Sequence, residues 1–193
     1  MCDAFDLREV RLILSARPGH RRDPGVNAEH RWEMLKLACA EHPKLVADDI
    51  ELSRPGESFT VRTLEDVHGA HPDAVVCWIL GQDSFATLGS WYQWHRILDL
   101  ANLIVLERPG HASDEPIGIG ELCRLHEVDE LRPDRQGQIV RLAIPMLEIS
   151  STKIRSALVQ RGANARDPHD LLANPVYTYI RQHQLYQNLE KAI

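Results

Sequence analysis

The chain has 193 residues, a length typical of one domain rather than two. Apolar residues make up 44% of the sequence and charged residues 26%, which excludes a disordered or fibrous protein. The 22 basic and 28 acidic residues give a net charge of −6, which disfavours binding of nucleic acid. Because the sequence contains neither a membrane-spanning apolar run nor a signal-peptide pattern, we expect no membrane association and a cytoplasmic location.

Five short aliphatic and β-branched runs predict strands, most of them buried on both faces. In chain order they are Val10 to Leu14, Leu45 to Ile50, Val75 to Leu80, Leu103 to Leu106 and Ile139 to Ile144. Segments with helical spacing separate them. We expect Asn27 to cap the first of these helices and Ser58 or Thr60 to cap the second. Alternating strands and helices predict an α/β protein with a doubly wound parallel sheet.

The tail from Ser151 onward is mostly helical in pattern, and Asn174-Pro175 is typical of a helix start. We therefore predict a single domain, in which residues 1–148 carry the sheet with its helices and residues 149–193 form a helical C-terminal part. The widely spaced cysteines form no C-x-x-C motif, so reduced thiols are expected.

The segment from Ser150 to Arg155 combines features that suit a phosphate. Three hydroxyl side chains, Ser150, Ser151 and Thr152, stand at the expected start of a helix, where backbone N–H groups are unsatisfied and the helix dipole is positive. Arg155 follows one turn later. The alternative is that a serine only caps the helix and that Arg155 is a surface charge.

Two further segments follow predicted strands, where open α/β sheets place their ligands. The turn from Ser15 to Arg22 gathers three arginines and His20, although a solvated loop is an alternative interpretation. After the third predicted strand, Gly81 would let a ligand approach the backbone and Asp83 would accept hydrogen bonds from ribose hydroxyls.

Three aromatic residues, Trp91, Tyr92 and Trp94, fall within four positions. They cannot all face one core, so at least one is expected on the surface or in a pocket, where it would stack on a flat ring. Core packing remains the alternative for each of them. The sequence contains no P-loop, no nucleophile elbow and no H-E-x-x-H zinc motif.

Together these segments resemble bacterial nicotinate-nucleotide adenylyltransferases, of the Rossmann-like nucleotidyltransferase superfamily. The resemblance is collinear over nearly the whole chain. It includes Arg17 to Arg21, Ser58 to Val61 with Thr63-Leu64, Gly81 to Ser84, Ser90 to Tyr92, Arg108 to Gly110, Ile149 to Arg155, and Asn174 to Val176 with Tyr179-Ile180.

The resemblance implies a role for each matching group. The ATP phosphates and ribose would be held by Ser150, Ser151, Thr152, Arg155, Gly81 and Asp83, with His20 and Arg21 beside the triphosphate. The nicotinate pocket would comprise Phe59, Thr60, Trp91 and Tyr92, with Arg108 as a further phosphate contact. In this pocket the Trp91 indole would stack on the pyridine ring, and backbone N–H groups would receive the carboxylate. His20 and Arg155 are the candidate catalytic residues.

One part of the family pattern has no counterpart in this sequence: the first strand, the glycine-rich turn and the H-x-G-H motif. We therefore expect about 25 to 30 residues, on the scale of a βαβ unit, to precede Met1 in the functional polypeptide. The sheet would be incomplete without them. The chain as written would then be nearly inactive and poorly soluble.

The implied reaction transfers the adenylyl group of ATP to nicotinate mononucleotide, giving deamido-NAD and pyrophosphate, with Mg²⁺ accompanying ATP. The attacking phosphate has a second pKa of about 6, so no general base is required. A homo-oligomer is compatible with the sequence. Two alternatives stay open: a sister adenylyltransferase with another phosphorylated substrate, and a non-catalytic nucleotide-binding protein.

Overall fold

The computed structural model describes residues 5–17, 25–107, 116–143, 149–159 and 168–187. The chain divides into two compact units. Unit 1 comprises Met1–Glu57 and Glu148–Ile193, and unit 2 comprises Ser58–Leu147.

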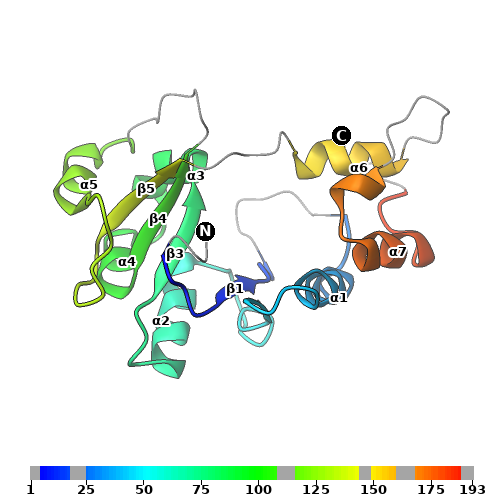
Figure 1. The fold of residues 1–193 in the computed structure, drawn as a ribbon, viewed down its shortest axis with the longest axis horizontal. Coiled ribbons are helices and arrows are strands. Elements are labelled where there is room, and N and C mark those ends of the chain that lie inside the picture. The colour runs from blue at the N-terminus through cyan, green and yellow to red at the C-terminus, as the bar shows by residue number, and fades with distance from the viewer. Residues whose placement is uncertain (1–4, 18–24, 108–115, 144–148, 160–167, 188–193) are drawn as a thin grey trace. The chain divides into compact units, whose positions relative to one another are not determined.

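Unit 2 contains a three-stranded parallel sheet with helices after its strands (Figure 1). Its strands are β3 (Cys77–Gly81), β4 (Asn102–Glu107) and β5 (Ile139–Ala143), in the order β3-β4-β5. Its α-helices are α2 (Thr60–Ala70), α3 (Gln82–Ala86), α4 (His95–Leu100) and α5 (Gly120–His126), and the short 3₁₀ helix η1 spans Leu88–Ser90. Because the strands are parallel, each connection crosses back over the sheet and usually carries a helix.

Strand β4 is the centre of unit 2. Its residues from Asn102 to Val105 are buried, because β3 and β5 pair with it on both edges. Side chains from the sheet and the surrounding helices form one apolar core. Its fully buried members include Val61, Leu64, Phe85, Leu88, Ile97, Leu103, Val105, Cys123 and Ile139.

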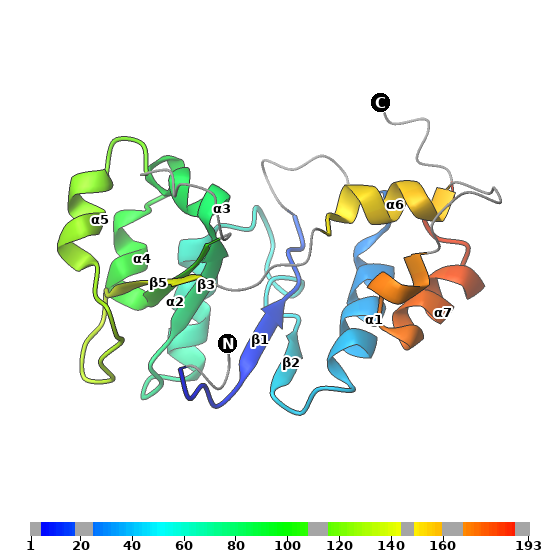
Figure 2. The ribbon, with the colours of Figure 1, turned by 45° about the horizontal axis from the view of Figure 1, so that its top comes forward.

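Unit 1 contains a two-stranded parallel sheet and a group of helices (Figure 2). Strand β1 (Val10–Ile13) pairs with β2 (Leu45–Asp48). The helices are α1 (Ala28–Cys39), α6 (Ser151–Val159) and α7 (Asn174–Gln182), with the 3₁₀ helix η2 over Pro168–Leu171. Helices α1 and α7 lie side by side in both ribbon views (Figures 1 and 2).

Apolar contacts between α1, α6 and α7 hold the helical part of unit 1 together. Leu158, Val176 and Ile180 are the buried residues of this cluster, and Met34 and Leu37 of α1 pack against them. The C-terminal part of the chain is therefore joined to the first helix by packing rather than by sequence proximity.

The predicted α/β architecture is confirmed, and all five predicted strands are present. In the described residues the strands form two parallel sheets, so β1 pairs only with β2 and β3 only with β4. The expectation of burial on both faces is confirmed for most of β4. Strands β1 and β2 are only half-buried, because a two-stranded sheet has no interior strand.

The expected helix starts have mixed outcomes. Asn27 caps α1 as expected, since its side-chain oxygen accepts a hydrogen bond from the backbone N–H of His30 at 2.9 Å. The expectation for the second helix is wrong, because Phe59 occupies the cap position of α2 and no side chain completes the cap.

We predict that Gly137→Ala destabilises the protein. Gly137 has φ +74°, and a Cβ atom there would lie 2.9 Å from the carbonyl oxygen of Leu98. The left-handed conformation alone costs a non-glycine residue about 1–3 kcal/mol, and the contact adds to this cost. Urea unfolding measures the loss in the free energy of unfolding.

Gly118→Ala is the matched control for this prediction. Gly118 has φ +78°, but a Cβ atom there would meet nothing within 4 Å. It should therefore lose only the conformational part. Equal losses in the two variants would contradict the predicted contact with Leu98.

Candidate functional site

The first candidate site, in unit 2, is built on two aromatic rings from distant parts of the sequence. Phe59 stands immediately before α2, and Tyr92 follows η1. Their ring centroids are 4.6 Å apart and their planes are inclined by 33°. Tyr92 keeps 45% of its surface exposed, and Thr60 begins the helix beside this pair. The structure thus brings together three of the four residues expected to form the nicotinate pocket.

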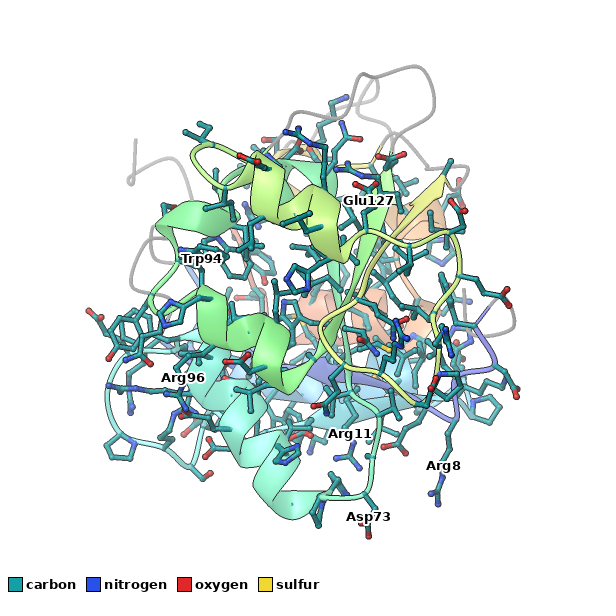
Figure 3. The ribbon with its side chains drawn as sticks, turned by 90° about the vertical axis from the view of Figure 1, so that its left-hand side faces the viewer. Arg8, Arg11, Asp73, Trp94, Arg96 and Glu127 are labelled. Atoms are coloured by element: carbon teal, nitrogen blue, oxygen red, sulfur yellow. The ribbon has the colours of Figure 1, made fainter. Side chains whose placement is uncertain are left out.

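Trp91, the fourth residue, is half-buried and packs against the core of unit 2. Its indole Nε1 lies 3.4 Å from the hydroxyl of Thr87, to which it donates. Trp94, which is labelled in Figure 3, is half-buried against the same core. Packing against the core therefore explains the buried part of each indole. The predicted stacking role of Trp91 stays a prediction.

Arg62, in the first turn of α2, also belongs to this site. Its guanidinium carbon lies 5.4 Å from the ring centroid of Phe59 and 5.8 Å from that of Tyr92. Sequence reasoning missed Arg62, which stands between the matching segments Ser58 to Val61 and Thr63-Leu64. Only the position of Tyr92 in the fold reveals that this arginine faces two rings.

Gly81 and Asp83 lie at the carboxyl end of β3, as predicted. Gly81 is exposed and ends the strand, and Asp83 is in the first turn of α3. Gly81 has an ordinary φ of −77°, and a Cβ atom added to it would meet nothing within 4 Å. Neither backbone conformation nor packing therefore requires glycine here, and the open space leaves room for a ligand to approach the backbone.

The second candidate site, in unit 1, is the start of α6. The backbone N–H of Lys153 donates to the Ser150 hydroxyl at 3.1 Å, so Ser150 caps the helix. Ser151 and Thr152 are exposed, and Arg155 donates to the Thr152 hydroxyl at 3.5 Å. The capping interpretation therefore holds for Ser150, whereas exposed hydroxyls and a cation remain at the same helix end.

A cavity of about 340 Å³ adjoins this helix start. This volume is at the lower end of the range for small-molecule sites. Its lining combines apolar side chains with one hydroxyl and one ammonium group, and consists of Ile149, Ser150, Lys153, Ile154, Ala157, Pro168 and Leu171.

Two arginines of unit 1 act on one tyrosine. Burial raises the pKa of Tyr186, and the charges of Arg155 and Arg31 oppose that rise, so both cations act on the same phenol. The guanidinium group of Arg31 donates to the carbonyl oxygens of Ser15 at 2.8 Å and Ala16 at 3.3 Å, which anchors the turn after β1. Sequence reasoning missed Arg31, because nothing local connects it with a turn 15 residues earlier.

The remaining predicted site residues, His20, Arg21 and Arg108, lie outside the described residues. Within the described ranges, no three histidine, cysteine or acidic side chains are grouped in a way that would hold a metal ion. Of the described helices, none combines the length and apolarity needed to cross a membrane.

One family model and several curated proteins match most of this chain. The family model described as cytidylyltransferase-like matches residues 1–157. A probable nicotinate-nucleotide adenylyltransferase of Hydrogenovibrio crunogenus is 40% identical, over 95% of this chain and 86% of that protein. The corresponding protein of Aeromonas hydrophila is 39% identical, over 96% of this chain and 86% of that protein.

A solved structure gives the same fold at lower identity. Plasmodium falciparum nicotinic acid mononucleotide adenylyltransferase, complexed with NaAD, superposes with a TM-score of 0.68 and 20% identity. The superposition covers 97% of this chain and 89% of that one. It supports the Rossmann-like fold.

We predict that Ser150→Ala lowers the free energy of unfolding by about 1 kcal/mol, the usual contribution of a serine cap. The reason is the hydrogen bond from the Lys153 N–H to the Ser150 hydroxyl. Ser151→Ala is the matched control, because its hydroxyl is exposed on the first residue of α6. Urea unfolding of both variants tests this difference. A larger loss for Ser151→Ala would contradict the assignment of the cap.

Proposed function

The chain belongs to the nicotinate-nucleotide adenylyltransferase family, and on that premise we propose how its residues serve adenylyl transfer from ATP to nicotinate mononucleotide in NAD biosynthesis. One observation carries the assignment of residues: exposed hydroxyls and an arginine share the first turns of α6, beside a cavity. We also propose that the two units are parts of one nucleotidyltransferase domain. The family match supports this, since it runs through both of them.

The start of α6 is the proposed phosphate site for ATP. Ser151 and Thr152 would donate hydroxyl hydrogen bonds, and Arg155 would neutralise charge on the phosphates. The structure gives Ser150 a capping role, so its contribution would be to fix the helix start. His20 remains a proposed phosphate contact.

The aromatic site of unit 2 is the proposed mononucleotide site. Its rings suit a flat pyridine ring, and a helix start lies beside them at Thr60. Trp91 is the proposed stacking residue, and Arg108 a proposed phosphate contact. Asp83 would accept hydrogen bonds from the ribose of a nucleotide.

In the proposed reaction a phosphate oxygen of nicotinate mononucleotide attacks the α-phosphorus of ATP, and the bond from that phosphorus to the β-phosphate oxygen breaks. Deamido-NAD and pyrophosphate result. The attacking phosphate is already largely dianionic at neutral pH, because its second pKa is about 6. The protein's contribution is therefore to position both substrates and to stabilise negative charge on the α-phosphoryl group and on pyrophosphate.

ATP would enter as its magnesium complex. Mg²⁺ is commonly held by substrate phosphates with one or two carboxylates rather than by a cage of protein ligands. We propose the cytoplasm as the compartment. The free thiols of Cys39, Cys77 and Cys123 support this proposal.

The test of this function is a calorimetric titration of the chain with nicotinate mononucleotide, nicotinamide mononucleotide and MgATP. We expect binding of ATP and a preference for the acid mononucleotide, because charge-assisted hydrogen bonds are roughly twice as strong as neutral ones. Equal affinity for the two mononucleotides would contradict the proposed acceptor, and binding of ATP alone would favour a different phosphorylated acceptor.

Two variants should each weaken binding of a different substrate. Trp91→Ala should weaken binding of the mononucleotide by about fivefold or more, the worth of an aromatic stack, and leave ATP binding nearly unchanged. Arg155→Ala should weaken ATP binding by about tenfold with little effect on the mononucleotide. Separate titrations with each substrate measure both effects.

Matched controls exist for both variants. Trp94→Ala removes a second half-buried indole that packs against the same core, and Arg181→Ala removes an exposed cation of α7. Neither control should alter substrate binding. If Trp91→Ala and Trp94→Ala lowered the melting temperature equally and left binding unchanged, Trp91 would be a core residue only.

A further inference from the structure

We propose that Arg62 determines specificity for the acid mononucleotide by pairing with the carboxylate on the pyridine ring. The inference rests on the proposed function, because it names the group that selects the acceptor. It adds a cationic side chain to a pocket in which backbone N–H groups were expected to bind the carboxylate.

Arg62 lies against two aromatic rings. The guanidinium carbon of Arg62 lies within 6 Å of both ring centroids, 5.4 Å from that of Phe59 and 5.8 Å from that of Tyr92. A cation over the face of a ring at such distances is attracted by the negative face of the π-system. One arginine is thus held by two rings, which come from different segments and contact each other at 4.6 Å.

Arg62 and Arg96 differ in their electrostatic partners. Within the described part of the chain, no carboxylate forms an ion pair with Arg62. Arg96, on the first turn of α4 and labelled in Figure 3, provides the contrast. Its guanidinium group pairs with Glu65 and also donates to the Gln93 side chain at 3.0 Å. Arg96 is therefore neutralised within the protein, whereas Arg62 keeps a positive charge beside the aromatic pair.

The free edge of a guanidinium group stacked on rings suits a carboxylate. A guanidinium group that contacts rings through its face keeps the N–H donors at its edge, and their planar fork matches the two oxygens of a carboxylate. A flat ring that carries a carboxylate therefore suits this site. An amide offers one acceptor oxygen without charge, together with an NH₂ donor that would face the cation. The acid should consequently gain more from Arg62 than the amide does.

The experiment compares dissociation constants of nicotinate mononucleotide and nicotinamide mononucleotide for the unmodified chain and three variants. Arg62→Gln should weaken binding of the acid by about tenfold and change binding of the amide by less than about twofold. Arg62→Lys should give an intermediate loss, because it keeps the charge without the fork. Arg96→Gln is the matched control and should change neither constant. Melting temperatures verify that all three variants are folded.

Three outcomes would overturn the inference. An equal loss for both mononucleotides in Arg62→Gln would place Arg62 on the phosphate that they share. An unchanged preference for the acid would leave recognition of the carboxylate to backbone donors alone. If the unmodified chain bound neither mononucleotide, the proposed function would fail and the inference with it. That last result is distinguishable, because it requires no variant.

Discussion

Parallel pairing of β4 with both β3 and β5 is the constraint on which unit 2 depends. This pairing buries most of β4, and it requires each chain connection to return over the sheet before the next strand begins. The carboxyl ends of the strands consequently share one edge, where Gly81 is exposed and α3 begins. The segment after η1 carries Tyr92 to the ring of Phe59. The aromatic site is therefore a result of the crossovers and not of any local motif.

Much of this fold follows from short-range patterns. The aliphatic runs predict all five strands, since buried parallel strands are continuous in apolar character. Asn27 predicts the start of α1, because a cap needs only a side-chain acceptor three residues before its donor. The same reasoning gave a wrong prediction for the start of α2, where Ser58 or Thr60 was expected to be the cap. Phe59 occupies that position, where a ring that contacts Tyr92 replaces a polar cap.

The sequence revealed neither helix α5 nor the contacts that Arg31 and Arg62 make with distant residues. Helix α5 buries only Cys123 and exposes Leu125. A single buried position provides no helical periodicity to detect. Arg31 and Arg62 were likewise missed, because each acquires its meaning from a partner at least 15 residues away. Aromatic and phosphate-binding segments were predictable as types, whereas the cations that complete them were not.

Local charge also explains how an acidic protein suits anionic substrates. Arg11 on β1 pairs with Glu9 and Asp48, and Figure 3 labels it together with Glu127, which pairs with Arg141 of β5. These cations are neutralised by neighbouring carboxylates. Arg62 instead contacts two aromatic rings, and Arg155 contacts a threonine hydroxyl. A net charge of −6 therefore does not oppose the proposed ligands, because a bound substrate responds mainly to charges within a Debye length of about 8 Å. Steering over longer distances would be weak, so affinity for the two substrates should depend on contacts made within each site.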